Sequence, residues 1–591
     1  MDSRTAAHVL DRIGGLLDLA GAGRFQARAY RLAADAVLAL GEDDLSAKLR
    51  DGSLAAVPGV GPATLAVLRE LVETGESSML ERLRETVPEG LLEVVRVPGL
   101  TSAKVRTIHE LLDVRSLDDL EAAIDDGRLA SVRGLGPKTI ERIRKGISVV
   151  RSTRTLVRLP QAAEEAARLA ALVQQHPGVS ATEIVGDVRR WCEVVGTIAM
   201  VAECTDPPER VLHDLTKASG VRESTLLSPT EGELCFVDGT VLHVACTTSH
   251  RCAMTVWRMT GSEQHVARLR EYAYTIGYRL DGDVLFDALG QPIHIPTEEA
   301  LYNALGLPWI PPELREGLGE VVAASAGELP ALLTNADIRG VLHCHSTYSD
   351  GSATIAEMAD GARARGWSYI GITDHSAAAF YAGGLSREQV LRQHEEIDRL
   401  NAGYGDGFRI LKGIECDILA DGTLDYSGYD SDDSVLDRFD YVVGSIHSRF
   451  SMTEEAMTER VLRAMDDPRL TILAHPTGRL LLGRAGYAID LEAVIEKAAA
   501  CGVVLELNAD SHRLDLDWRW CRVASTRGVM LAIGPDAHSV RGLDNVWLGV
   551  RMARKGWVGA GGVLNAMSVE EVLGMARERR ELLVPGPQRS Q

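Results

Sequence analysis

Residues 340–351 read GVLHCHSTYSDG, an apolar strand candidate that ends in a cluster of metal-binding side chains. His343 and His345 are two residues apart, and side chains two apart on an extended segment point to the same face. Six more strand candidates follow, separated by helical stretches, at residues 369–375, 409–418, 441–447, 470–476, 503–509 and 529–538. This alternation predicts a parallel α/β barrel or a doubly wound sheet from residue 337 onward.

All of these strand candidates except 503–509 end in side chains that bind metals. The set is His343, His345, Asp350, His375, Glu415, His447, His475, Asp536 and His538. A single histidine at a strand end is usually a satisfied polar core residue, but six of the eight histidines after residue 336 fall there. The carboxyl ends of parallel barrel strands meet on one face, so a shared site is expected. Imidazole and carboxylate without thiolate suit Zn, Mn or Fe, and more than four ligands imply more than one ion.

The two remaining histidines of this region, His394 and His512, lie away from strand ends. His394 falls in a charged helical stretch. Each is expected either to lie on the surface or to contact a metal ligand without binding the metal itself.

Residues 1–150 carry apolar positions at helical spacing and almost no alternating pattern, which predicts an all-helical region. A short phrase recurs there as VPGVGP at 57–62, VPGL at 97–100 and VRGLGP at 132–137, each time before a helical stretch. This is the helix-hairpin-helix signature, in which a glycine turn and a helix start approach a DNA phosphate. A plain tight turn is the alternative, and Thr101 replaces a glycine in the second copy. The candidate DNA contacts are Gly59, Gly61, Gly99, Gly134, Gly136 and Lys138.

The composition excludes several classes of protein. The 591 residues include 63 Lys and Arg against 84 Asp and Glu, a net charge of −21, so DNA binding has to come from local geometry rather than bulk charge. The nine cysteines form no C-x-x-C pair, which argues against a zinc ribbon and indicates reduced packing residues. We find no long apolar run and no secretory signal, so we expect a cytoplasmic protein without a membrane segment.

The segment from 337 to 580 resembles the PHP (polymerase and histidinol phosphatase) family of metal-dependent phosphoesterases. The resemblance rests on HCHSTYSDG, ITDHS, GIECDI, SIHS, AHPTGR and DAHS. It implies a distorted TIM-like barrel of the (β/α)7 type and three divalent metals, Mn or Zn, with Fe as an alternative. The implied ligand groups are His343, His345, Glu415 and Asp536; Glu415, His447 and His475; and Asp350, His375 and His538. Arg479 is either a phosphate clamp or a structural salt bridge.

The whole chain resembles the bacterial family X DNA polymerases (PolX), on FQARAYRLAADAV, VGDVRRWCEVVGTIAM, TGSEQHVARLR and EEALYNALGLPWIPPELREG. The fold class implied is multidomain, with an all-α hairpin-containing start, an α+β palm and thumb, and the PHP barrel. The domains expected are a lyase-like domain at 1–90, a fingers-like region at 91–154, a palm at 155–247, a thumb at 248–318, a linker at 319–336 and the PHP domain at 337–580.

The catalytic positions of the family depart from its pattern. The family holds two metals with Gly-Asp-x-Asp and a third Asp on a neighbouring strand, whereas this chain has Thr197, Ala199 and either Val241 or Leu242. A site without carboxylates does not hold two divalent ions, so we expect templated synthesis to be lost or very weak. No lysine occurs between Lys48 and Lys104, which argues against a Schiff-base lyase by that route.

The sequence therefore predicts a DNA-repair enzyme whose chemistry resides in the PHP barrel. The expected reaction is metal-dependent 3'-5' exonuclease activity, with related 3'-end or abasic-site cleavage, on gapped, nicked or 3'-terminal DNA without sequence preference. The protein is expected to act as a monomer. The alternatives are a gap-filling family X polymerase, a small-molecule phosphatase of the histidinol phosphatase type, and a non-catalytic DNA-binding scaffold.

Overall fold

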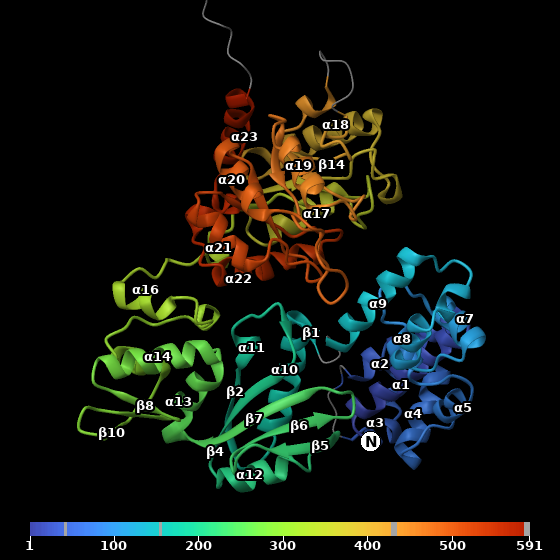
Figure 1. The fold of residues 1–591 in the computed structure, drawn as a ribbon, viewed down its shortest axis with the longest axis vertical. Coiled ribbons are helices and arrows are strands. Elements are labelled where there is room, and N and C mark those ends of the chain that lie inside the picture. Colours follow the sequence, from blue (N-terminus) through green and yellow to red (C-terminus); the bar gives the residue numbers. More distant parts are fainter. Residues whose placement is uncertain (39, 41–43, 153–155, 427–433, 584–591) are drawn as a thin grey trace, which may run out of the picture. The chain divides into compact units, whose positions relative to one another are not determined.

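The structure is a computed structural model that describes residues 1–38, 40, 44–152, 156–426 and 434–583 (Figure 1). The expected boundary at 154/155 lies outside the described residues. The chain forms two compact units, one of Met1–Thr260 with Gly277–Leu301, the other of Gly261–Ile276 with Tyr302 onward. The expected thumb at 248–318 is thus divided between the two units.

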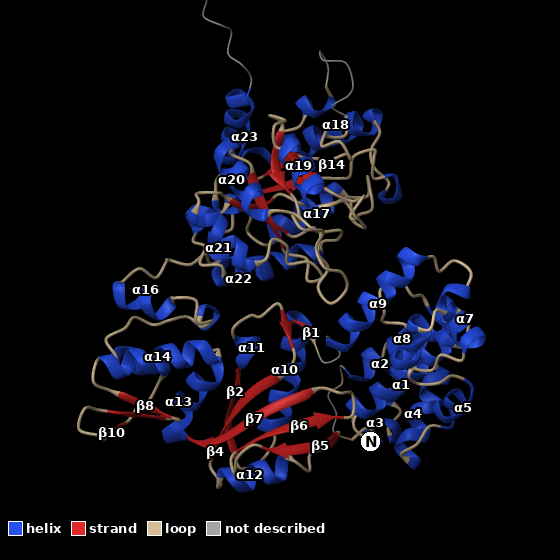
Figure 2. Ribbon diagram, viewed as in Figure 1, coloured by secondary structure: helices blue, strands red, loops and turns tan. Residues whose placement is uncertain are grey.

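The N-terminal region is all-helical in its described residues, as the sequence predicts (Figure 2). Its helices bury leucine, isoleucine and valine at helical spacing in one core, with Leu10, Leu68 and Ile108 fully buried. The helices are α1 (Ser3–Leu19), α2 (Arg24–Leu38), α3 (Ser46–Arg50), α4 (Pro62–Thr74), α5 (Ser78–Thr86), α6 (Leu91–Val94), α7 (Ser102–Leu112), α8 (Leu117–Asp125) and α9 (Pro137–Ser152).

A mixed five-stranded sheet follows, with strand order β2-β4-β7-β6-β5. Only β4 and β7 pair in parallel, with Ala199 opposite His243. The elements are β1 (Val157–Arg158), α10 (Leu159–Gln174), β2 (Val179–Val185), α11 (Gly186–Arg189), β3 (Val194–Val195), β4 (Ile198–Cys204), α12 (Pro208–Leu215), β5 (Val221–Leu226), β6 (Glu231–Phe236), β7 (Val241–Thr248) and α13 (Ser249–Thr260).

Short elements lead from this sheet to the barrel. They are α14 (Glu263–Thr275), β8 (Arg279–Asp281), β9 (Val284–Phe286), β10 (Pro292–Ile293), α15 (Glu298–Ala304) and α16 (Glu320–Ala326). The segment expected as a linker, 319–336, differs from that expectation because it contains α16 and packs onto the barrel unit. The backbone amide of Leu333 donates to the carbonyl of Val558 at 3.0 Å.

The C-terminal unit alternates parallel strands with helices. Five of its strands, β12 and β15 to β18, are buried along their whole length, as is usual where helices cover the outside of a parallel sheet. The strands are β11 (Gly340–Val341), β12 (Tyr369–Ile372), β13 (Arg409–Lys412), β14 (Glu415–Asp417), β15 (Val442–Ser445), β16 (Leu470–Leu473), β17 (Val504–Asn508) and β18 (Leu531–Gly534). The helices are α17 (Ile355–Ala364), α18 (Arg387–Tyr404), α19 (Glu454–Ala464), α20 (Leu491–Cys501), α21 (Trp518–Thr526), α22 (Val546–Lys555) and α23 (Val569–Leu583).

These strands form a closed barrel. One sheet has the order β11-β12-β13 and the other β14-β15-β16-β17-β18. Parallel bridges join the two sheets on both sides, between His375 and Glu415 and between Cys344 and Ala537. Since β13 and β14 are successive parts of one interrupted strand, the described barrel has seven strand positions, consistent with the predicted (β/α)7 type. Closure brings the residues after all of these strands to one end.

Candidate metal centre

The nine candidate metal ligands converge at the carboxyl ends of the barrel strands. Seven of them form three overlapping groups whose ligand atoms lie within 4.8 Å of one another: His345, Asp350, His375 and His538; His343, His345 and Glu415; and His375, Glu415 and His447. His475 joins the third group, because its Nε2 lies 3.1 Å from Oε1 of Glu415. Residues up to 195 positions apart in the sequence thus surround one small volume.

The distances from His343 and His345 to Glu415 and Asp536 fit a metal ion better than direct hydrogen bonds. His343 Nε2 lies 3.5 Å from Glu415 Oε2 and 3.7 Å from Asp536 Oδ1, and the corresponding distances for His345 are 3.6 and 3.3 Å. Four ligands at Zn–N and Zn–O distances in a tetrahedron stand about 3.4 Å apart. His343 Nε2 and Glu415 Oε2 are buried without a hydrogen-bond partner in the described chain, which an ion between them would supply.

A second group surrounds Asp350. Its Oδ1 lies 3.2 Å from His538 Nε2 and 3.6 Å from His375 Nε2. This group is the most open, because the side chains of Asp350 and His538 are 38% and 40% exposed whereas that of Glu415 is 1% exposed. This side of the centre is therefore the more exposed one.

The charges of the centre favour a cation. Burial lowers the pKa of His375 and His447, but Glu415 outweighs this effect and raises the pKa to about 10 for His375 and about 9 for His447. Burial acts to raise the pKa of Glu415, yet the surrounding imidazoles hold it well below its usual range. In the metal-free protein protons occupy the His375 and His447 imidazoles, and a divalent ion would take the place of those protons.

Residues behind the ligands orient them, and the sequence analysis missed these residues. Glu506 of β17 accepts hydrogen bonds from His343 Nδ1 at 2.5 Å and from the His475 backbone amide at 2.7 Å. Asp417 bonds His447 Nδ1 at 2.6 Å. The signal in the sequence was a glutamate inside the apolar stretch VVLELNA, the one strand candidate judged to lack a site residue. Partners of this kind fix the tautomer and direction of a metal-binding imidazole.

The two other histidines of the barrel differ from each other. His512 is exposed on the surface, as expected, and its Nδ1 bonds Asp510 at 3.0 Å. The surface prediction for His394 is wrong: it is 7% exposed and its ring packs edge-on against Phe439 at 4.8 Å. Burial, reinforced by the nearby Lys412, lowers the pKa of His394 to about 4, so it is a neutral core residue.

Arg479 adopts the salt-bridge geometry that was one of its two alternatives. Its Nη1 donates to Asp517 Oδ2 at 2.8 Å, and its Nε and Nη2 donate to the carbonyls of Arg513 and Leu514. These bonds hold the segment after β17 in place. Arg513 on that segment is the arginine that faces the ligands, with Nε 3.6 Å from Asp536 Oδ2.

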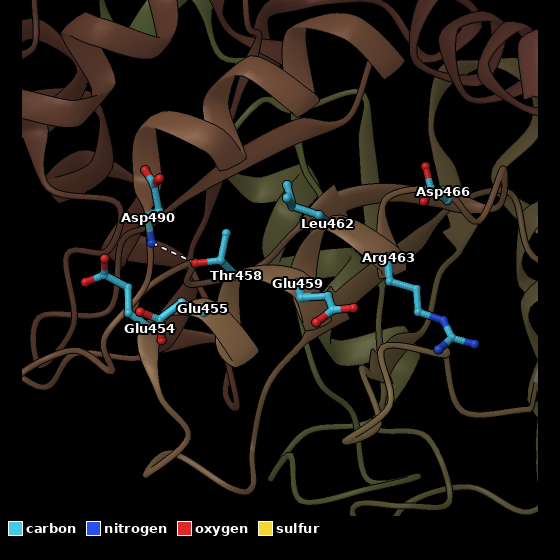
Figure 3. Close-up of a pocket in the computed structure, with 8 residues that line it drawn as sticks. All are labelled: Glu454, Glu455, Thr458, Glu459, Leu462, Arg463, Asp466 and Asp490. Carbon is cyan, nitrogen blue, oxygen red and sulfur yellow. Dashed lines mark hydrogen bonds between the residues drawn. The ribbon is translucent and has the colours of Figure 1, made fainter.

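A separate hollow of about 500 Å³ lies beside α19 and contains none of the candidate ligands (Figure 3). Five carboxylates and a single arginine face it, which disfavours a phosphate ligand. Its lining residues are Glu454, Glu455, Thr458, Glu459, Leu462, Arg463, Asp466 and Asp490.

Comparison with known proteins places the chain in a family. Residues 91–148 match a SAM-like helix-hairpin-helix tandem, residues 255–316 the DNA polymerase beta thumb, and residues 342–508 the PHP domain. The chain is 35% identical over 575 residues to the DNA polymerase/3'-5' exonuclease PolX of Bacillus subtilis, which covers 97% of this chain and 99% of that protein. The chain belongs to the bacterial PolX family.

The barrel of this PolX protein also has shorter relatives. It is 30% identical over 220 residues to a probable phosphatase of Caldanaerobacter subterraneus, covering 34% of this chain and 77% of that protein. It is 29% identical over 209 residues to the probable phosphatase YcdX of Escherichia coli, covering 34% of this chain and 78% of that protein. The PHP match and these relatives support a metal-dependent phosphoesterase.

None of the described helices is long and apolar enough to span a bilayer.

The three hairpin turns of this PolX protein share one backbone conformation. Gly59, Gly99 and Gly134 have φ of +99°, +93° and +87°, a region that glycine adopts without strain. Packing also favours glycine at Gly59, where a Cβ would lie 3.1 Å from the Leu32 carbonyl, whereas at Gly99 it would meet only the flexible Arg142 guanidinium at 3.0 Å. At Gly61, Gly134 and Gly136 a Cβ would meet no described atom within 4 Å, so these turns are open to a ligand. Lys138 is exposed beside them.

Of the positions expected to form the palm site, Ala199 lies in apolar surroundings. Ala199 is 9% exposed and packs with Val185, Val201 and Val256 in one hydrophobic cluster. Its cross-strand neighbour is His243, which lies 3.6 Å from Glu231. Val241 begins β7, and the positions of Thr197 and Ala199 flank Ile198, which pairs with Leu242.

Proposed function

We propose that this PolX protein hydrolyses phosphodiesters at the 3' ends of DNA, with related cleavage of 3'-blocking and abasic groups, and that its polymerase site is inactive. The single observation that carries the proposal is the convergence of nine imidazole and carboxylate ligands at ligand-to-ligand spacing. The printed name of the Bacillus subtilis relative, which includes 3'-5' exonuclease, supports the direction of digestion.

The residues of the centre fit three divalent ions, with Mn, Zn and Fe all compatible with the donor atoms. Such ions, when bound, acidify a water molecule and polarise the phosphoryl oxygens. Side chains of this protein orient the ligands and bind the substrate. Glu506 orients His343, and Asp417 orients His447. Arg513 stands close enough to the ligands to bind a substrate phosphate oxygen through its planar fork.

The hairpins supply DNA affinity without reading sequence. Backbone amides at an open glycine turn contact phosphate groups, which carry no base information. We propose that Gly61, Gly134, Gly136 and Lys138 make such contacts and hold gapped, nicked or 3'-terminal DNA on a monomeric protein. The acidic net charge of −21 makes this local geometry necessary.

The loss of synthesis is supported by the surroundings of the palm positions. Two catalytic ions need carboxylates, and the corresponding positions hold Thr197, Ala199 and Val241. The arginines that follow Gly186 are engaged within the protein, because Arg189 donates to Glu298 at 2.5 Å and Arg190 donates to Asp187 and to the Thr260 carbonyl. They are therefore not held ready for an incoming triphosphate.

One gel tests the proposal. A 5'-labelled primer on a gapped template is incubated with the full chain, Mn²⁺ and all four deoxynucleotides. We expect the primer to shorten, and the double variant His343→Ala, Asp536→Ala to lose this activity while its DNA affinity stays within about twofold, because the ligands lie in a different domain from the hairpins. Primer extension would overturn the inactive palm, and cleavage by the double variant would overturn the metal assignment.

A small-molecule phosphatase is the second candidate, because the barrel's shorter relatives are named probable phosphatases. Comparing kcat/KM for short phosphate monoesters with that for the labelled primer separates the two. A preference for the monoester by a factor of ten or more, together with weak DNA binding, would favour the phosphatase.

A further inference from the structure

The loop that follows the metal ligand His375 leaves the barrel and returns to it. Residues 376–385 begin at Ser376, whose amide donates to the Glu415 carbonyl at 2.9 Å, and end at Leu385, whose amide donates to the His375 carbonyl at 2.8 Å. Both ends of the loop are thus attached to metal ligands.

The base of this loop is held firmly. The amide of Ala377 donates to the Tyr426 hydroxyl at 3.0 Å, and that of Ala378 donates to Asp425 at 2.8 Å. Ala379 is 1% exposed and Ala382 is 6% exposed, so the loop packs onto the domain on both sides of its tip. Its position relative to the ligands is therefore defined.

The tip of the loop presents two aromatic rings to solvent. Phe380 is 85% exposed and Tyr381 is 63% exposed, and their rings meet edge-to-face at 6.0 Å. Large apolar side chains held in water on a well-packed loop contribute little to folding and mark a binding surface.

These rings adjoin the metal centre. The Tyr381 ring lies 6.3 Å from the ring of the ligand His447 in an edge-on contact. A nucleotide whose phosphate reaches the metals therefore has its base close to Tyr381.

We propose that Phe380 and Tyr381 form a stacking platform for the nucleobases of a single-stranded 3' end and position its last phosphodiester over the metals. Aromatic rings stack on every base, so the platform is tolerant of sequence. The inference rests on the proposed nuclease function and adds the residues that position its substrate strand.

A kinetic experiment compares two substrates on the full protein, a single strand with natural 3'-terminal bases and one whose last two residues are abasic tetrahydrofurans. We expect Phe380→Ala, Tyr381→Ala to raise KM about tenfold on the natural strand, with kcat little changed, and to match the parent protein on the abasic strand. Tyr381→Phe keeps the ring and should resemble the parent protein. Tyr274→Ala removes a ring that is 79% exposed on α14 and serves as the matched control.

Equal losses on both substrates would overturn the proposal, because the loop would then act on the metal centre rather than on bases. Unchanged kinetics on the natural strand would overturn it as well.

A binding readout separates this proposal from the nuclease function. A phosphorothioate strand with 2-aminopurine at its 3' end is titrated with protein, and stacking on the rings should quench its fluorescence in the parent protein but not in the double alanine variant. Quenching without cleavage of a natural strand would support the platform and overturn the nuclease. Equal quenching by both proteins would overturn the platform.

Discussion

At the scale of single residues, the carboxylate of Glu506 links two ligands of different strands. It accepts from the His343 ring and from the His475 amide, so it requires two acceptor oxygens. In Glu506→Gln the amide NH₂ group would face one of these donors. We expect metal affinity to fall about 10- to 100-fold while the fold is retained, measured by calorimetric titration of the metal-free protein with Mn²⁺. Glu496→Gln, at an exposed glutamate, is the control, and an unchanged affinity in Glu506→Gln would contradict the role of Glu506.

The imidazoles of the site give the metal-free protein a defined pH dependence. Glu415 raises the pKa of His375 to about 10 and that of His447 to about 9 against the opposing effect of burial. A raised pKa stabilises the fold fully below the unfolded value near 6.5, and this stabilisation is lost as pH rises through the folded values. The melting temperature of the metal-free protein should therefore decrease from about pH 7 to pH 10. The melting temperature of the metal-bound protein should fall less over this range. Identical melting profiles with and without metal would contradict the assignment of these histidines as metal ligands.

At the scale of elements, strand β4 explains why restoring two carboxylates should not restore synthesis. Ala199 lies in an apolar cluster beneath α13, and an aspartate there would be buried beside Val185 and Val256 at a cost of several kcal/mol. The third carboxylate is also absent from β7. We expect Thr197→Asp, Ala199→Asp to extend a primer no better than the parent protein and to lower its melting temperature. Robust primer extension would show that β4 is aligned wrongly with the family.

At the scale of the whole molecule, the segment before the barrel belongs to the barrel unit. Glu313 bonds Arg554 Nε at 2.8 Å, and Glu316 pairs with Lys555, which is 1% exposed. A fragment of residues 337–591 lacks Glu313 and Glu316, the carboxylate partners of α22, whereas a fragment of residues 261–591 contains them. We expect the shorter fragment to be less stable by about 3–5 kcal/mol in urea denaturation, because a buried ammonium loses its carboxylate partner. Equal stabilities would indicate that the segment is a linker after all.

The sequence by itself determined the classes of structure and predicted the candidate ligand set. Helical spacing in residues 1–150, the hairpin phrases and the strand-end histidines are local patterns, and local patterns depend only on residue identity and period. The glycines at 59, 99 and 134 could be recognised for the same reason, since few other residues adopt their backbone conformation.

Only the tertiary structure determined which side chains contact one another and which remain exposed. β17 pairs with β16, which precedes His475, and barrel closure brings His343 within hydrogen-bond distance of Glu506, so Glu506 acquires its role from neighbours more than 30 residues away. Packing likewise turned Arg479 toward Asp517, buried His394 against Phe439, and left Phe380 in solvent. Burial and hydrogen-bond partners are properties of assembled strands and helices, and the spacing of residues along one chain does not contain them.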